Sequence, residues 1–227
     1  MTLKDGVFQI INVLSYVSVG SVLLPIACYF FVKKKNQVIK LLFILLLASL
    51  VSDVCNEIYV RAGFRGYLIL NIFFVVQITL LSQIFALLLK EWKIVFITLA
   101  VFWAFFILNS IFLQPINEYQ SLLRLIGGLI ILGHSVYYYF LLFKNLPTDS
   151  LLRYSPAWIV DAVSYYFSFN LFLFVIANYL FKNEPEMGML FWGFHSINNV
   201  IKNCLFAAGI YLAEAKNKSD FNDNLWH

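Results

Sequence analysis

Residues 195–203 read His-Ser-Ile-Asn-Asn-Val-Ile-Lys-Asn and lie inside an otherwise apolar run from about residue 187 to residue 212. At about 1.5 Å of rise per residue, a helix over this run is long enough to cross a bilayer. Its polar residues are spaced i, i+3, i+4 and i+7 on one helix face: His195, Asn198, Asn199 and Lys202. A lysine inside a membrane helix is costly unless paired or hydrated, so the stripe predicts polar partners on other helices.

The rest of the chain is so apolar that a bilayer is expected to solvate most of it. Of the 227 residues, 62% are hydrophobic and only 12% are charged, which leaves too little polar surface for a soluble domain. The net charge of +4 includes no basic patch interleaved with aromatic residues, so no nucleic-acid partner is expected. Cys28, Cys55 and Cys204 lie in apolar segments without CxxC spacing, so we expect no disulfide framework, no metal and no cofactor.

Apolar runs separated by short polar segments predict an all-α, polytopic bundle of seven transmembrane helices. Their expected ranges are 7–32, 38–60, 68–89, 94–112, 119–142, 155–181 and 187–212. Pro25 is expected to kink the first helix. That first run is about twice as long as a signal-peptide core, so we expect it to be retained as an anchor. The domain prediction is one seven-helix domain over 1–212 and a short cytoplasmic polar tail over 213–227.

The uneven distribution of lysine and arginine predicts the orientation. With the N-terminus outside, the inner side would hold Lys33, Lys34, Lys35, Lys40, Lys90, Lys93, Lys144, Arg153, Lys216 and Lys218. The outer side would hold only Lys4, Arg61, Arg65 and Lys182. Because cytoplasmic segments carry the excess of basic residues, the pattern predicts N-outside and C-inside. We expect a multi-pass protein of the bacterial inner (cytoplasmic) membrane, with the lipid bilayer as its first partner.

Distances along the helices predict two layers of polar side chains. In the outer layer, Asp53 and Glu57 are expected to face Arg124 and His195. In the deep layer, Lys202 is expected to form a buried ion pair with Asp161, with His134 at the same depth. The predicted ligand-binding residues line an outward-facing polar cavity: Arg124, His195, Asn198, Asn199, Lys202, Asp53, Asn56 and Glu57.

Structural roles are open for the same residues. Glu57 and Arg124 are close enough to a helix end to extend toward the membrane surface. The pair of Lys202 with Asp161 is compatible with a purely structural ion pair, and His134 with a satisfied core residue. Isolated asparagines such as Asn71, Asn109, Asn170 and Asn178 are typical of interhelical hydrogen bonding.

Several chemistries lack their required residues. A lysine in a seventh helix is similar to the retinal-binding lysine of microbial rhodopsins, but here helix 68–89 has no charge and Asn198 stands one turn before Lys202. His134 and His195 are predicted about 10 Å apart in depth, which disfavours a zinc site. No nucleophile-elbow, Walker or paired-carboxylate protease motif is present, so we expect no enzyme.

Three segments carry a resemblance to a broader group: Phe73–Ser82 (FFVVQITLLS), Leu108-Asn109-Ser110 with Gln114, and Asn198–Gly209 (NNVIKNCLFAAG). They resemble uncharacterised bacterial seven-helix integral membrane proteins of the Bacteroidota type. That group often has Glu where Gln77 stands, so one charge is missing here. The resemblance implies the seven-helix architecture and assigns no activity.

We therefore expect an inner-membrane sensor or ligand-binding protein that recognises a small polar or anionic ligand. A separate signalling protein is expected as its partner, because no segment is left for an output domain. The alternative is a small secondary transporter or proton-coupled carrier, in which the carboxylates and His195 would titrate during alternating access. An intramembrane enzyme and a retinal-binding protein are weaker alternatives.

Overall fold

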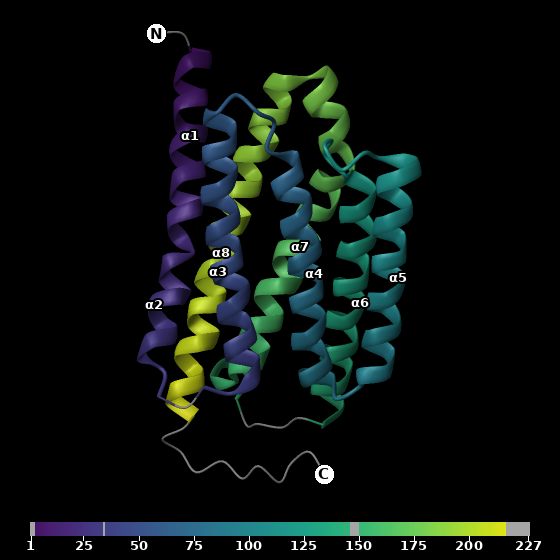
Figure 1. The fold of residues 1–227 in the computed structure, drawn as a ribbon. Coiled ribbons are helices and arrows are strands. Elements are labelled where there is room, and N and C mark those ends of the chain that lie inside the picture. The colour runs from purple at the N-terminus through teal and green to yellow at the C-terminus, as the bar shows by residue number, and fades with distance from the viewer. Residues whose placement is uncertain (1–2, 34, 146–149, 217–227) are drawn as a thin grey trace.

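A computed structural model describes residues 3–33, 35–145 and 150–216, and their regular structure is entirely helical (Figure 1). The α-helices are α1 (Leu3–Ser21), α2 (Leu23–Phe31), α3 (Gln37–Arg61), α4 (Tyr67–Leu89), α5 (Trp92–Leu108), α6 (Ser121–Asn145), α7 (Ser155–Asn183) and α8 (Pro185–Lys216). A π-helical turn, η1 (Asn109–Leu113), continues α5, and a 3-10 turn, η2 (Leu151–Arg153), precedes α7. The predicted all-α class is confirmed.

Six stretches of the described chain are helical, long and apolar enough to cross a membrane: Gln9–Phe31, Gln37–Arg61, Tyr67–Leu89, Trp92–Leu113, Ser121–Asn145 and Ser155–Asn183. The first joins α1 and α2, which are separated only at Val22. Pro25 lies three residues later and has no N–H to donate to the Ser21 carbonyl, which accounts for the interruption. The predicted kink therefore falls one turn before the proline.

α8 is as long as these spans but is not one of the six, because its polar stripe makes it less apolar. It packs along α7 on one side and along α1 and α2 on the other. The helix continues to Lys216, beyond the predicted domain boundary at residue 212. Ala213-Glu214-Ala215-Lys216 consists of strong helix formers, so the helix outlasts the apolar run. The rest of the predicted polar tail, 217–227, lies outside the described residues.

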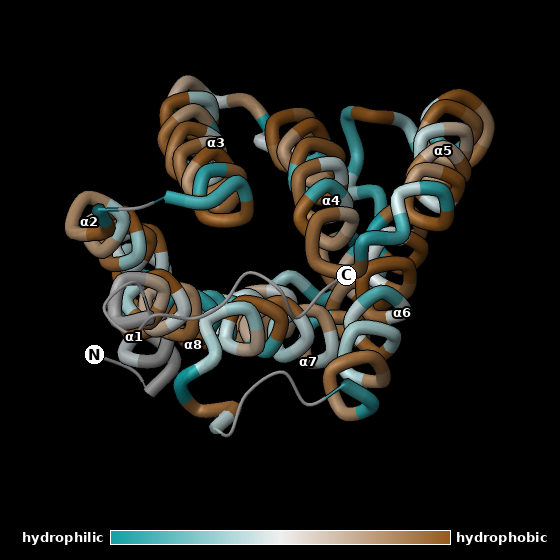
Figure 2. The backbone as a smooth tube through the Cα atoms, turned by 90° about the horizontal axis from the view of Figure 1, so that it is seen from below, coloured by the Kyte–Doolittle hydropathy of each residue, from teal (hydrophilic) through white to brown (hydrophobic). Residues whose placement is uncertain are grey.

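The helices form two layers, seen end-on in Figure 2. One layer contains α1 and α2, α8, α7 and α6, and the other contains α3, α4 and α5. α3 packs closely against α4 and also contacts α2, while α4 and α5 pack on α6. The N-terminal end of the bundle, at the top of Figure 1, carries the α3–α4, η1–α6 and α7–α8 connections, and the last turn of α8 lies at the opposite, C-terminal end.

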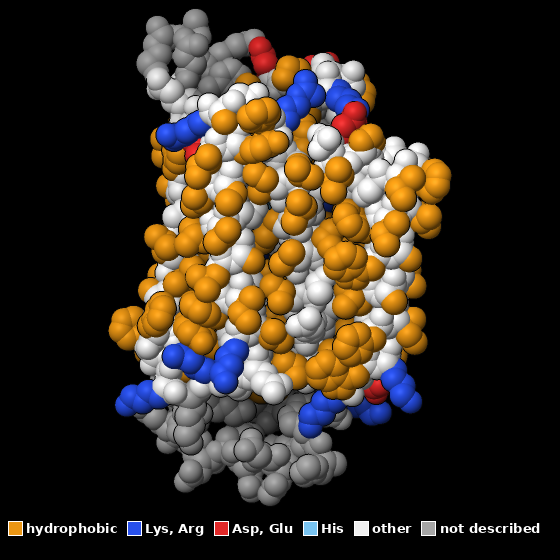
Figure 3. Space-filling view, in the orientation of Figure 1, with side chains coloured by type: hydrophobic (Ala, Val, Ile, Leu, Met, Phe, Trp, Pro, Cys, Tyr) orange, Lys and Arg blue, Asp and Glu red, His pale blue; other side chains and the backbone are white. Residues whose placement is uncertain are grey.

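The surface of the bundle has a broad apolar zone. Figure 3 shows hydrophobic side chains over the middle of the visible face, with charged side chains gathered near both ends. Large hydrophobic side chains such as Phe30, Val101, Val136 and Phe172 are exposed. Helices satisfy their own backbone hydrogen bonds and can present such side chains to lipid. The surface is therefore compatible with an integral membrane protein in contact with a bilayer.

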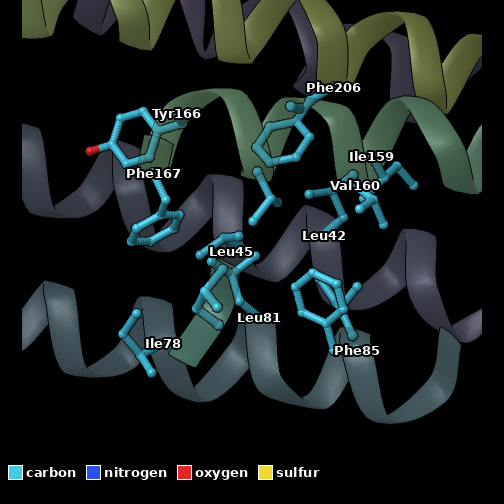
Figure 4. Close-up of a cluster of buried hydrophobic side chains, with 14 of the residues drawn as sticks. Leu42, Leu45, Ile78, Leu81, Phe85, Ile159, Val160, Tyr166, Phe167 and Phe206 are labelled. Atoms are coloured by element: carbon cyan, nitrogen blue, oxygen red, sulfur yellow. The ribbon is translucent and has the colours of Figure 1, made fainter. Parts of the chain in front are cut away.

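Between the two layers, the half nearer the C-terminal end is filled by a hydrophobic core (Figure 4). Leu42 from α3, Phe85 from α4 and Phe167 from α7 are almost completely buried in it, and Phe206 of α8 packs there as well. Tyr166 marks the side of this core that faces the polar half of the interlayer space. The core therefore closes the interior toward the C-terminal end and leaves the other half for the site.

Gly127 of α6 permits the close approach that joins the two layers. A β-carbon at this position would lie 2.9 Å from Phe74 and 3.0 Å from Phe102, both buried rings. We expect Gly127→Ala to lower the free energy of unfolding by about 1–3 kcal/mol, because these rings cannot withdraw without disturbing the core. Gly133→Ala is the matched control on the same helix, since nothing lies within 4 Å of its β-carbon position.

Circular dichroism of the detergent-solubilised variants measures the difference. Gly133→Ala should be neutral or slightly stabilising, because alanine favours the helix over glycine. Equal melting temperatures for Gly127→Ala and Gly133→Ala would contradict the close packing of α6 on Phe74 and Phe102.

Candidate functional site

A polar cavity occupies the half of the interlayer space nearer the N-terminal end. Its inner part, the inner cavity, spans about 580 Å³ of space not filled by atoms, with its open mouth included. A larger cavity, of about 1330 Å³ when its open mouth is included, adjoins it and extends to Arg61, the last residue of α3. Asp53, Trp192, His195 and Asn199 line both cavities, so the two form one continuous space.

The polar side chains of the inner cavity come from both layers. Asp53 (α3) and Gln77 (α4) belong to one layer, and Arg124 (α6), Tyr166 (α7), His195, Asn199 and Lys202 (α8) belong to the other. The three residues of α8 lie together because their spacing of i, i+4 and i+7 places them on one face. The local sequence of α8 thus provides one wall, while the second layer brings the opposing groups.

Lys202 lies at the bottom of the inner cavity and is 8% exposed. Its Nζ donates a hydrogen bond of 2.5 Å to Asn199 Oδ1 and lies 4.6 Å from the centroid of the Tyr166 ring. Asn199 Nδ2 in turn donates to Ser18 Oγ of α1 at 2.8 Å. The ammonium group is thus held by an amide oxygen and an aromatic face.

Arg124 is the second buried cation of the inner cavity, with 4% exposure. Its Nη1 donates to Asn71 Oδ1 at 2.7 Å, and its Nη2 donates to the Leu70 carbonyl at 3.2 Å. The guanidinium carbon lies 4.1 Å from the Tyr119 ring centroid and 5.2 Å from that of Phe74. Burial raises the pKa of the Tyr119 hydroxyl, so this ring is a neutral phenol beside the cation.

Asn71 connects Arg124 to the segment between η1 and α6. Its Nδ2 donates to the Ile116 and Glu118 carbonyls, each at 2.7 Å. The same side chain therefore orients the guanidinium and fixes the backbone over the end of α4. Interhelical hydrogen bonding was predicted for Asn71, but the sequence alone gives no sign that Arg124 is its partner.

His195 lines the inner cavity together with the two cations. Its Nδ1 is 2.8 Å from Asn170 Oδ1, which fixes the ring against α7. The ring lies 4.8 Å from the Trp192 ring, centroid to centroid, and also packs against Tyr166. His195 thus presents an aromatic surface to the cavity, with one ring nitrogen engaged by a neutral amide.

The charges that line the inner cavity favour an anion. Within the described part of the chain, neither Arg124 nor Lys202 forms a salt bridge, and the carboxylate lining the inner cavity is Asp53. Asp53 is half-buried and lines the same cavity as Lys202. One guanidinium and one ammonium group against one carboxylate leave an excess of positive charge in the inner cavity.

Most residues of the predicted ligand-binding set lie around this continuous space. Arg124 and Lys202 line the inner cavity, Asn56 and Glu57 line the larger one, and Asp53, His195 and Asn199 line both. Asn198 departs from the prediction: it is 1% exposed, and its Oδ1 accepts a hydrogen bond of 3.0 Å from the Tyr165 hydroxyl. The stripe is wider than the cavity wall, so Asn198 turns toward α7.

Glu57 also has a different partner from the one predicted. Arg61 Nε donates to Glu57 Oε1 at 2.7 Å, and both side chains are exposed. Neighbours four apart on one helix meet easily, whereas Arg124 is buried across the bundle. The predicted contact of Glu57 with Arg124 and His195 is therefore replaced by a local pair on α3.

The predicted deep ion pair is not formed. Asp161 is exposed, and its Oδ1 accepts a hydrogen bond of 2.5 Å from the Tyr139 hydroxyl. Five residues along α7 correspond to about 140° of rotation, so Asp161 points away from the interior face that carries Tyr166. Lys202 packs at the Tyr166 ring of α7, so it and Asp161 lie on different faces of that helix.

His134 also lies away from Lys202. Its Nε2 is 3.0 Å from Thr98 Oγ1 on α5, and its ring packs against Phe85 at 5.6 Å between centroids. The described residues contain no group of three or more His, Cys, Asp or Glu side chains arranged to hold a metal ion. His134 is thus part of the packing between α4, α5 and α6.

Several aromatic residues of the cavity were not predicted. Trp192 lies three residues before His195, on the same face of α8, so its spacing was an available signal. Tyr166 and Tyr119 had no such signal. The chain contains 24 Phe and 13 Tyr, so an aromatic residue that faces a cavity does not stand out from those that face lipid or the core.

The fold and site define a helical protein, compatible with a membrane, that has a cationic internal cavity. Comparison of the chain with protein-family models, with curated proteins and with solved structures finds no match. The resemblance to Bacteroidota-type membrane proteins therefore stays a prediction, and the function has to be argued from the cavity.

A double-mutant cycle tests the charge arrangement. We expect Asp53→Asn and Lys202→Met to show a coupling free energy of about 0.5–3 kcal/mol, because the two groups carry opposite charges and line the same inner cavity. Asp161→Asn with Lys202→Met should show almost none, because Asp161 faces away. Unfolding in sodium dodecyl sulfate measures both coupling free energies. A larger coupling for Asp161 with Lys202 than for Asp53 with Lys202 would contradict this arrangement and support the ion pair predicted from the sequence.

Proposed function

We propose that this protein is a multi-pass sensor or ligand-binding protein of the bacterial inner membrane and that it binds a small anionic molecule in its polar cavity. The observation that carries the proposal is the burial of Arg124 and Lys202 along one cavity without a salt bridge to either within the described chain. The proposal assigns binding and no catalysis.

The energetics of buried charge favour a bound anion. Removing a cation from water costs several kcal/mol unless hydrogen bonds and an opposite charge compensate it. Asn71 and Asn199 supply neutral acceptors, and Asp53 supplies one negative charge. A carboxylate or phosphate between Arg124 and Lys202 would neutralise the remaining charge, and Arg124 offers a planar donor suited to either group.

The proposed topology has seven spans, with α8 as the seventh. Two features support it: α8 lies along α7 and along α1 and α2, and its 32 residues correspond to about 48 Å of helix. Its polar stripe faces the cavity and neighbouring helices, so the stripe is compatible with a membrane position.

The proposed orientation is N-outside and C-inside. Exposed lysines at the C-terminal end include Lys33, Lys40, Lys90, Lys93 and Lys144. The described part of the N-terminal end presents Arg61, Arg65 and Lys182, and two of these have acidic neighbours: Glu57 for Arg61 and Glu118 for Lys182. The positive-inside rule then directs the larger cavity outward.

Binding without flux is the leading form of the proposal, because buried side chains such as Leu42, Phe85 and Ile159 fill the interior nearest the C-terminal end. Occupancy of the cavity would have to be passed to a separate signalling protein. A ligand in the inner cavity would contact α3 in one layer and α6 and α8 in the other. The partner would respond to a displacement of these helices when the ligand binds.

A carrier is the second candidate, and one observation favours it. A smaller pocket continues beyond Lys202 toward the C-terminal end, between Leu45, Leu81 and Phe206. Helix discontinuities, which carriers often use, are present at Val22 and in η1. Alternating access would require the hydrophobic core to open, so liposome flux that is lost in Asp53→Asn would favour the carrier.

Thiol labelling tests the orientation and the cavity together. In a background with Cys28, Cys55 and Cys204 replaced by alanine, we expect Glu57→Cys and His195→Cys to react with a membrane-impermeant maleimide from outside intact cells. Both positions line the larger cavity, which extends to the end of α3.

Asp161→Cys is the control, because Asp161 lies near the opposite end and outside the cavity. Gel shift of the labelled protein gives the readout. Protection of positions 57 and 195 from the outer reagent, together with labelling after permeabilisation, would reverse the proposed orientation.

Mass spectrometry of compounds that co-purify with the gently solubilised protein tests binding. We expect an anionic compound whose recovery falls about tenfold or more in Lys202→Met, because a buried charge partner is removed. Lys182→Met is the matched control, since Lys182 is exposed and pairs with Glu118 outside the cavity. Equal recovery from wild type and both variants would refute the anion site.

A further inference from the structure

The larger cavity lies between α1 and α3, which belong to different layers (Figure 2). α1 packs on α8 and α2, whereas α3 packs on α4 and contacts α2. Ser15 and Val19 line the cavity from α1, and Val54 and Ile58 line it from α3. The two helices are therefore walls of the cavity, both contact α2, and exposed lining side chains on both mark an opening between them.

The edge of this opening is apolar and exposed. Tyr16 on α1 is 64% exposed, and Val54 and Ile58 on α3 are 48% and 64% exposed. All three line the larger cavity, yet they belong to the surface that would meet acyl chains in a bilayer. Farther in, Asp53, His195 and Asn199 continue into the inner cavity. The space thus changes from an apolar edge to a polar, cationic interior.

Charged groups also line this path. Arg61 donates to Glu57, and both line the larger cavity together with Tyr16 of α1. Arg124 and Lys202 lie in the inner cavity. A molecule entering between α1 and α3 would therefore pass hydrogen-bonding groups at the edge before it reached the two buried cations.

We propose that the ligand is a membrane amphiphile with an anionic head group, which enters laterally between α1 and α3. The head group lies near Arg124 and Lys202, and the apolar chains leave through the opening beside Val54 and Ile58. This inference rests on the proposed anion-binding function and specifies its ligand class. The physical reason is that a polar cavity opening into hydrocarbon needs an occupant that satisfies both environments.

A fully water-soluble anion would leave half of this arrangement unused. It would meet the cations but would gain nothing from the exposed side chains at the edge. The chains of an amphiphile can stay in the hydrocarbon beside Val54 and Ile58 while its head group reaches the cations, so they need not enter water. A membrane amphiphile and a water-soluble anion share the phosphate or carboxylate group, and only the amphiphile has apolar chains.

Native mass spectrometry of the full-length protein provides the test. One arm offers equal amounts of phosphatidylglycerol and phosphatidylcholine in detergent. The other offers glycerol 3-phosphate, which has the phosphate without acyl chains. We expect phosphatidylglycerol to be retained about tenfold more than phosphatidylcholine, and glycerol 3-phosphate neither to bind comparably nor to displace the lipid.

Tryptophan substitutions on α3 test the route. Val54→Trp should reduce phosphatidylglycerol retention about tenfold, because the larger side chain fills the opening. Val51→Trp is the matched control: Val51 is 60% exposed on the same helix but does not line the cavity. Ile58→Trp provides a second test if Val54→Trp does not fold.

The outcomes separate the two proposals. Glycerol 3-phosphate binding that equals lipid binding and is lost in Lys202→Met would retain the anion site and overturn lateral entry. Equal retention of the two lipids, or equal effects of Val54→Trp and Val51→Trp, would also overturn the inference. Anion binding that is unchanged in Lys202→Met would overturn the proposed function itself.

Discussion

The burial of Lys202 in the middle of α8 imposes the main constraint on this structure. An ammonium group at that position needs acceptors, and α8 supplies Asn199 one turn away while α7 supplies the Tyr166 ring. Asn199 is itself held by Ser18, which ties α1 to the same stripe. The packing of α8 between α1 and α7 is therefore also the solution to a solvation problem, because in a bilayer no bulk water is available to replace these contacts.

Arg124 is also a buried cation that needs hydrogen-bond acceptors, but its partners are of a different kind. Its donors engage Asn71 and the Leu70 carbonyl, and two aromatic rings cover its faces. The side-chain amide of Asn71 donates hydrogen bonds to two carbonyls in the segment between η1 and α6. Orientation of the cation and closure of the adjoining loop thus depend on one asparagine. Both buried cations rely on neutral acceptors, which preserves a net positive cavity.

The half of the interlayer space nearer the C-terminal end stabilises the fold, and the half nearer the N-terminal end contains the proposed binding cavity. Toward the C-terminal end, large apolar side chains meet across the layers and hold them together (Figure 4). Toward the N-terminal end, polar side chains surround open volume, and α1 and α3 stand apart as its walls. A bundle that was apolar throughout would be more firmly closed, but it would have no place to bind an anion. The proposed ligand site is therefore confined to the less tightly packed half.

The sequence by itself determined the helical class, the approximate ends of the helices and the polar stripe of α8, because apolar runs and helical periodicity are properties of neighbouring residues. It also brought Asp53, Arg124, His195 and Lys202 into consideration, since charges in apolar runs are conspicuous. Only the tertiary structure decided that Asp161 faces Tyr139, that Asn198 faces Tyr165, and that Asn71 holds Arg124. These contacts depend on the rotation of each helix about its axis, which is set by packing between distant segments and leaves little trace in the sequence of any one helix.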